Sequence, residues 1–151
     1  MHEPTFNLTS TAFGEGGAIP GRLTCDGENV SPDLSWAGAP DGTQALALIV
    51  TDPDARGFVH WIAFDLTGTP SGGLPAGVSA SPDAPPQGTN DFGRTGYRGP
   101  CPPSGTHRYV FALNALDRPL DLTGAPRIED VERAMDGHIL AQTTLTGTYH
   151  R

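Results

Sequence analysis

The sequence contains no lysine, so nine arginines supply all of its permanently positive side chains. Seventeen aspartate and glutamate residues outnumber them, and the formal net charge at pH 7 is −8. Binding to a nucleic acid requires a cationic surface that neutralises phosphates, so this composition argues against a nucleic acid partner. A small anion would have to be held by arginine, histidine or backbone N–H groups, because no lysine is available.

Long apolar runs are also missing. No stretch approaches the roughly 20 apolar residues that a transmembrane helix needs, so no membrane span is expected. Residues 1–8 lack the basic start and apolar core of a secretory signal, which leads us to expect a cytoplasmic protein. A length of 151 residues predicts one domain over residues 1–151.

Cysteine is scarce, with only Cys25 and Cys101 in the chain. The two lie too far apart for a CxxC redox motif and are too few for a structural zinc site. Each lies in a turn-rich segment, so they could form a disulfide if these segments meet. Because disulfides are rare in the cytoplasm, two reduced thiols are the preferred interpretation and a Cys25–Cys101 bridge is the alternative.

Glycine and proline are abundant, with 20 and 15 residues, and they separate short apolar segments. This pattern is typical of an all-β protein with many turns. Clear strands are predicted at 45–51, 58–66, 108–116 and 141–149, and weaker ones at 6–10 and 19–24. A short peripheral helix is predicted from about 126 to 135, because Pro126 suits its first turn and Gly137 its C-terminal cap. The irregular segment 67–89 is predicted to be a functional or mobile loop.

Polar side chains occur where three of the predicted strands begin or end. Asp52 and Asp54 follow the strand at 45–51, His60 lies near the start of the next strand, and His107 and Tyr109 share a face at the start of a third. If these strands are neighbours, the five residues form a pocket in which imidazoles contact an anion and an aspartate orients one ring. The alternative is that each group is satisfied separately, at the surface or in the core.

The neighbouring segments add to this candidate pocket. Residues 96–105 are rich in proline and glycine, so the loop that carries Pro102 and Pro103 is predicted to hold its shape before a ligand arrives. Arg98 adds positive charge to that loop. Strand alternation in 58–66 places Phe58 and His60 on one face, together with Ile62 and Phe64.

A metal site and a catalytic site are the competing interpretations. The spacing of the histidines and aspartates matches no compact metal-binding motif, so neither a metal nor a cofactor is predicted. Ser104 lies in no nucleophile elbow, and no catalytic motif is identified, so the protein is not expected to be an enzyme. The alternative is a hydrolase that uses Asp52, His60 and His107 as acid and base groups.

Several motifs, taken in order, resemble the bacterial branch of the phosphatidylethanolamine-binding protein family, also called the Raf kinase inhibitor-like family. They include Asp-Pro-Asp at 52–54, Gly-Pro-Cys-Pro-Pro at 99–103 and His-Arg-Tyr at 107–109. The other matching segments are 24–36, 45–51, 59–61, 90–97, 137–141 and 147–149. The resemblance covers nearly the whole chain and implies an antiparallel β-sandwich of Greek-key type with one or two short peripheral helices.

The resemblance also implies a site and a function. Its ligand-binding residues correspond here to Asp52, His60, Pro102, Pro103, His107 and Tyr109, and Asp54, Phe58 and Arg98 are further candidates. The family pocket accepts phosphate, phosphoethanolamine head groups, acetate or similar anions. We therefore expect a binding protein for a small anionic or phosphorylated ligand, which could act as a kinase or protease inhibitor-like regulator. A protein partner of unknown identity and a homodimer are compatible with this expectation.

Overall fold

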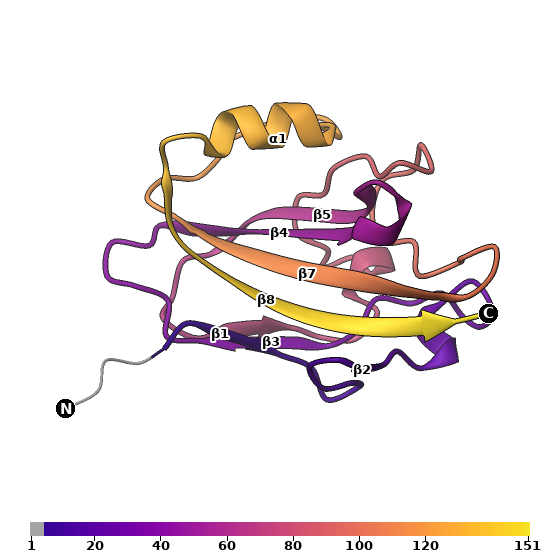
Figure 1. Ribbon diagram of the computed structural model, residues 1–151. Helices are drawn as coiled ribbons and strands as arrows, with labels where there is room; N and C mark the ends of the chain where they lie inside the picture. The colour runs from indigo at the N-terminus through magenta and orange to yellow at the C-terminus, as the bar shows by residue number, and fades with distance from the viewer. Residues whose placement is uncertain (1–4) are drawn as a thin grey trace.

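The computed structural model describes residues 5–151, which form two β-sheets and one α-helix (Figure 1). The smaller sheet has the strand order β1 (Asn7–Thr9), β3 (Leu34–Ala37) and β6 (Gly72–Leu74). The larger sheet has the order β2 (Gly17–Ala18), β8 (Ile139–His150), β7 (Thr106–Leu116), β4 (Ala45–Asp52) and β5 (Phe58–Thr67). The helix is α1 (Ile128–Met135), and three short 3-10 helices are η1 (Gly21–Leu23), η2 (Pro53–Ala55) and η3 (Val78–Ala80).

The prediction of a mainly β protein is confirmed, although not every predicted strand is present. The four clear strands correspond to β4, β5, β7 and β8, and the weaker segment 6–10 contains β1. The weak strand at 19–24 is wrong, because backbone N–H groups of Leu23 and Thr24 bond to carbonyls three residues back and form η1. The irregular segment 67–89 contains β6 and η3, and β3 was not predicted.

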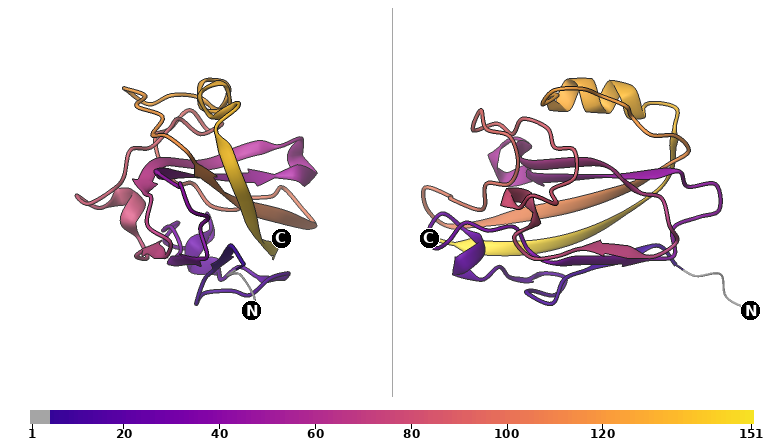
Figure 2. Two further views of the ribbon diagram at one scale, coloured as in Figure 1. Left: turned by 90° about the vertical axis from the view of Figure 1, so that its left-hand side faces the viewer. Right: turned by 180° about the vertical axis from the view of Figure 1, so that it is seen from behind.

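The main core lies between the two sheets. Trp36 from β3 packs in one buried cluster with Trp61 from β5 and Phe111 from β7. A second cluster lies on the outer face of the larger sheet, where Val131 and Met135 of α1 are buried (Figure 2). Because β4 is covered on both faces, it is a nearly continuous apolar run, as its sequence predicted.

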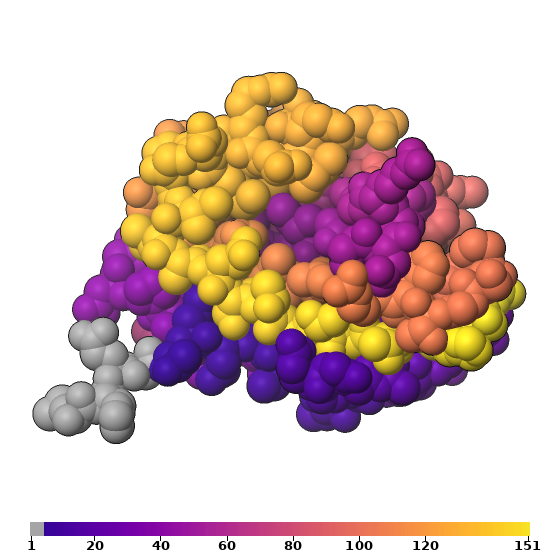
Figure 3. All heavy atoms as spheres, viewed as in Figure 1, coloured from indigo at the N-terminus to yellow at the C-terminus, as the bar shows by residue number. Residues whose placement is uncertain are grey.

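The helix and its flanking segments form the upper surface of the molecule in the space-filling view, and β8 crosses below them (Figure 3). Pairing is antiparallel except between β2 and β8, which are parallel. The Greek-key order of the expected sandwich stays a prediction. Across residues 5–151 no helix has both the length and the apolar character needed to cross a membrane.

Strand pairing brings the predicted site residues together. β4 pairs with β5 on one side and with β7 on the other, and both pairings are antiparallel. The end of β4 therefore lies beside the start of β5 and the start of β7. This places Asp52, His60 and His107 at one end of the larger sheet, although they are far apart in sequence.

Candidate functional site

A cavity of about 170 Å³ lies at this end of the sheet. Its lining residues are Asp52, Ala55, Phe58, His60, Phe92, Cys101, Pro102, Pro103, His107 and Tyr109. The six residues expected to bind a ligand are all among them, and so is Phe58. Asp54 and Arg98, the other two candidates, do not line the cavity.

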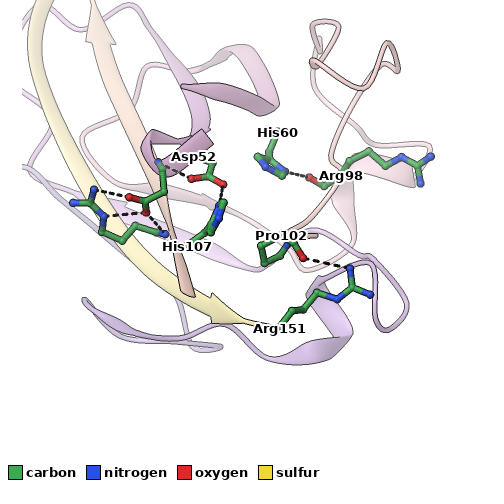
Figure 4. A network of polar contacts seen from close by, with 8 residues as sticks. Asp52, His60, Arg98, Pro102, His107 and Arg151 are labelled. Atoms are coloured by element: carbon green, nitrogen blue, oxygen red, sulfur yellow. Dashed lines mark hydrogen bonds and ion pairs between the residues drawn. The ribbon is translucent and has the colours of Figure 1, made fainter. Parts of the chain in front are cut away.

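Asp52 fixes the orientation of His107. The carboxylate is 3% exposed, and its Oδ1 accepts a hydrogen bond of 2.8 Å from the backbone N–H of Asp54. Its Oδ2 lies 2.5 Å from Nδ1 of His107 (Figure 4). Since a carboxylate only accepts, Nδ1 is the donor and the ring leaves its Nε2 for the cavity. When His107 is protonated, the same contact becomes an ion pair.

His60 lies at an irregularity in β5. Val50 pairs with Trp61 and Thr51 pairs with Val59, so His60 is the extra residue of a β-bulge. The bulge turns both His60 and Trp61 toward the same side of the sheet, where one reaches the cavity and the other the main core. A bulge of this kind changes where a side chain points without changing which strands pair.

The bulge corrects one prediction. Simple alternation placed Phe58, His60, Ile62 and Phe64 on one face, but Ile62 and Phe64 pack under the helix with Val59, in the second core cluster. Only Phe58 and His60 share the cavity side. The physical reason is that the extra residue shifts the period-two pattern by one position.

The environment of His60 keeps its ring neutral at neutral pH. Nδ1 lies 2.7 Å from the carbonyl oxygen of Arg98 (Figure 4). Burial lowers the pKa of His60 below its ordinary value of 6.5, and the Arg98 carbonyl and the charge of Asp52 only partly oppose this effect. The Gly99 backbone also acts on the ring and, like the Arg98 carbonyl, raises its pKa, whereas no group among residues 5–151 donates a hydrogen bond to Nε2 of His60.

Tyr109 forms part of the cavity between the two imidazoles. Its ring packs edge-on against His60, with centroids 5.2 Å apart, and stacks near His107 at 6.5 Å. Burial raises the pKa of the Tyr109 hydroxyl, so the phenol stays protonated. Tyr109 lines the cavity, and no hydrogen bond joins its hydroxyl to another described residue, so the phenol can donate to a ligand.

Asp54 and Arg98 have other roles. The Asp54 carboxylate accepts hydrogen bonds from the backbone N–H and the guanidinium of Arg108, at 2.8 to 3.2 Å, and these bonds lower the pKa of Asp54 to about 2. The side chain of Arg98 is exposed and extends away from His60, while its backbone carbonyl holds that ring (Figure 4). In the described part of the chain no arginine lines the cavity, so the cation expected from Arg98 is not supplied there.

Phe92 lines the cavity beside Phe58, and the sequence analysis singled out Phe58 but not Phe92. Phe92 is 44% exposed, and its ring contacts those of Phe58 and His60 edge-on, with centroids 4.7 and 5.4 Å apart. The side chain of the fully buried Asn90 holds this turn, because its Oδ1 accepts the N–H groups of Phe92 and Arg94. A turn-forming Asn two residues before an aromatic residue was the available signal.

The remaining wall is the proline loop, which is anchored to the segment 21–30. Cys25 and Cys101 are joined by a disulfide with a Cα–Cα distance of 5.5 Å. The preferred interpretation of two reduced thiols therefore differs from the bridged pair in the structure. Cys25 N–H also donates to the carbonyl of Pro100 at 3.1 Å, so the two segments lie directly side by side. The guanidinium of Arg151 donates to the carbonyl of Pro102 at 3.4 Å (Figure 4).

Acid should destabilise the protein partly through His60. Its folded-state pKa lies below 6.5, so between these two values the unfolded chain binds more protons and stability falls as the pH falls. Above pH 6.5 both states hold a neutral ring and this contribution vanishes. We expect urea denaturation from pH 8 to pH 5 to show a smaller loss of unfolding free energy for His60→Gln than for wild type. An equal or larger loss in the variant would contradict the lowered pKa.

Comparisons with known proteins identify the relatives of this chain. A family model described as phosphatidylethanolamine-binding protein matches residues 9–150. A UPF0098 protein of Methanothermobacter thermautotrophicus is 51% identical over 150 residues, which cover 96% of this chain and 99% of that protein. A UPF0098 protein of Aquifex aeolicus is 42% identical over 149 residues, covering 94% and 86%.

Two crystal structures have the same fold. A putative phosphatidylethanolamine-binding protein homolog, CT736 of Chlamydia trachomatis, superposes with a TM-score of 0.88 at 39% identity and covers 97% of each chain. YbcL of E. coli, described as a new member of the mammalian PEBP family, gives a TM-score of 0.86 at 28% identity and covers 97% of this chain and 98% of its own.

Proposed function

Because this chain belongs to the phosphatidylethanolamine-binding protein family, we propose that it is a binding protein whose cavity captures a small anionic or phosphorylated ligand. The family includes ligand-binding and regulatory proteins. The observation that carries the proposal is a set of three polar atoms with no hydrogen-bond partner among residues 5–151. These atoms are Nε2 of His60, Nε2 of His107 and the hydroxyl of Tyr109, and all three residues line one cavity.

The size and lining of the cavity support this proposal. A volume of about 170 Å³ corresponds to roughly six water molecules at about 30 Å³ each, which is enough for a phosphate-sized group. Phe58, Phe92, Pro102 and Pro103 form an apolar collar around the polar groups. Such a site suits a ligand with a small polar head and little else inside the cavity.

Among the described lining residues, only a histidine could give the cavity a positive charge. Asp54 and Arg108 neutralise each other outside it, and Asp52 is committed to His107. A protonated His107 would present a charged Nε2–H donor, and Tyr109 would add a neutral one. The anion would therefore be held by hydrogen bonds in a confined space, without a permanent positive charge.

Titration with inorganic phosphate tests the proposal. We expect millimolar phosphate to shift the imidazole NMR signals of His60 and His107, and the double variant His60→Ala/His107→Ala to lose binding. His138→Ala is the matched control, because His138 also contacts an aspartate, Asp117, but lies outside the cavity. If the signals of His60 and His107 stay unchanged at millimolar phosphate, the proposed pocket is not a phosphate site.

The two aspartates of the Asp-Pro-Asp motif should behave differently. Asp52→Asn removes the carboxylate that accepts from His107, so phosphate affinity should fall at least tenfold, or about 1.4 kcal/mol. Asp54→Asn disrupts only the exposed pair with Arg108 and should leave phosphate affinity within about twofold, because surface pairs contribute little. Calorimetric titration of both variants measures the difference. Equal losses would show that the two carboxylates share one role.

The hydrolase alternative gains no support, and the family is not an established enzyme family. Within residues 5–151, the cavity lining includes no serine or threonine, and its cysteine is in the disulfide. An inhibitor-like role toward a kinase or protease, a protein partner and a homodimer all stay predictions. The cytoplasmic location also stays a prediction, and the bridged cysteines make an oxidising compartment the alternative. Alkylation of the thiols in intact cells would decide between these locations.

A further inference from the structure

The hydrogen bond of His60 fixes which of its ring nitrogens carries a proton. Nδ1 faces the carbonyl oxygen of Arg98 at 2.7 Å, and a carbonyl can only accept. Nδ1 is therefore the donor in this contact. In the neutral ring Nε2 then carries a lone pair, and no described group donates to it.

The groups around His60 do not supply that proton. Phe58 and Phe92 cover it with apolar rings, and Tyr109 meets it edge-on from β7. The carboxylates whose charge acts on it from neighbouring segments are Asp52 and Asp91, and neither hydrogen-bonds the ring. Asp52 accepts from His107 and from the Asp54 backbone, and Asp91 accepts from the backbone N–H of Val59.

His107 is the remaining titratable group in the cavity, and it differs from His60. Its Nδ1 contacts a carboxylate, whereas the Nδ1 of His60 contacts a neutral carbonyl. The two imidazoles therefore offer a ligand different chemistry.

Resting on the proposed function, we propose that the cavity recognises an O–H group of the ligand, which donates to Nε2 of His60 while another ligand oxygen accepts from the Tyr109 hydroxyl. The ligand class is a phosphoryl group that carries a proton, either hydrogen phosphate or the monoanion of a phosphate monoester. Sulfate has a similar size and shape but carries no proton near neutral pH. It would place an oxygen lone pair against the lone pair of Nε2.

This arrangement should discriminate strongly. A site that hydrogen-bonds a ligand O–H rejects an analogue without it, because the buried acceptor is left unpaired. For sulfate, repulsion between two lone pairs is added to the loss of the hydrogen bond. The apolar residues around the site limit the access of water, so water does not replace that hydrogen bond. We expect phosphate to bind at least tenfold more tightly than sulfate at pH 7.5.

Calorimetric titration of the wild-type protein with sodium phosphate and sodium sulfate at pH 7.5 tests this selectivity without any variant. The ratio should narrow as the pH is lowered through the pKa of His60, because a protonated His60 donates to sulfate. In His60→Gln the ratio should approach one, since the amide can donate as well as accept. His138→Gln, the same substitution outside the cavity, should keep the wild-type ratio.

Methyl phosphate distinguishes a monoester ligand from free phosphate. The second pKa of methyl phosphate is about 6, so above pH 7 it must take up a proton to bind, whereas hydrogen phosphate already carries one. The affinity of methyl phosphate relative to inorganic phosphate should therefore fall about tenfold per pH unit. Equal binding of sulfate and phosphate at pH 7.5, or a ratio unchanged in His60→Gln, overturns the proposal while leaving anion binding intact. Binding of neither anion overturns the proposed function and this inference with it.

Discussion

Replacing Cys25 and Cys101 together by serine should lower the unfolding free energy by about 4 kcal/mol. The disulfide joins residues 76 positions apart, so it closes a long loop that would otherwise be free in the unfolded chain. Loop-closure entropy grows slowly with loop length, and a loop of this size lies near the upper part of its usual range. Both cysteines are exposed, so the serine hydroxyls meet water and add no burial cost.

Urea denaturation under non-reducing conditions measures this loss. A reducing agent should destabilise the wild-type protein by a similar amount and should leave the double serine variant unchanged. That comparison separates the covalent link from any local effect of serine. A loss below about 1 kcal/mol would contradict this prediction. It would mean that the two segments stay in contact in the unfolded chain even without the covalent bond.

The sequence predicted the parts of the fold that depend on simple periodicity. The continuous apolar run 45–51 marks β4, which is buried on both faces, and the apolar spacing of 126–135 marks the helix that covers the larger sheet. The Asp-Pro-Asp and His-Arg-Tyr motifs fall at ends of strands that pair, so the proximity of Asp52 and His107 followed from strand order. These features need only local pattern and neighbouring strands.

Features set by irregular geometry were harder to predict. The bulge at His60 shifts the alternation of β5, and no composition signal in 58–66 marks its position. Phe92 reaches the cavity because Asn90 holds a tight turn, which requires tertiary contacts to place. The direction of the Arg98 side chain was also unpredictable, because its backbone carbonyl is the group that contacts His60.

The two cysteines show how the tertiary structure can differ from an expectation based on composition. Composition and an assumed cytoplasmic location favoured reduced thiols, yet the segment 21–30 lies against the proline loop and brings the cysteines within bonding distance. Further bonds cross the same contact. The Tyr97 hydroxyl donates to the Leu23 carbonyl at 2.6 Å, and the Gly99 N–H donates to Asn29 Oδ1 at 2.7 Å. The wall of the cavity is therefore anchored at several points.

Gly99→Ala should be the most damaging single substitution in that contact, with a loss of about 3 kcal/mol from overpacking. A Cβ at this position would overlap the backbone carbonyl oxygen of Leu23 and press on Asn29, and a backbone oxygen cannot rotate aside. The displaced loop would carry the Arg98 carbonyl with it, so His60 would lose its fixed orientation. Phosphate affinity should therefore fall together with stability.

Gly14→Ala is the matched control, because a Cβ on the exposed Gly14 meets nothing within 4 Å. Its unfolding free energy should stay within about 0.5 kcal/mol of wild type, and its phosphate affinity should be unchanged. Urea denaturation and calorimetric titration of both variants give the comparison. If Gly99→Ala were as stable as Gly14→Ala, the segment 21–30 would have to move at little cost in free energy. The proline loop would then not be the preformed wall that the site requires. If Gly99→Ala kept normal stability but bound phosphate more weakly, the loop would have shifted without loss of stability, and His60 would have lost its fixed orientation.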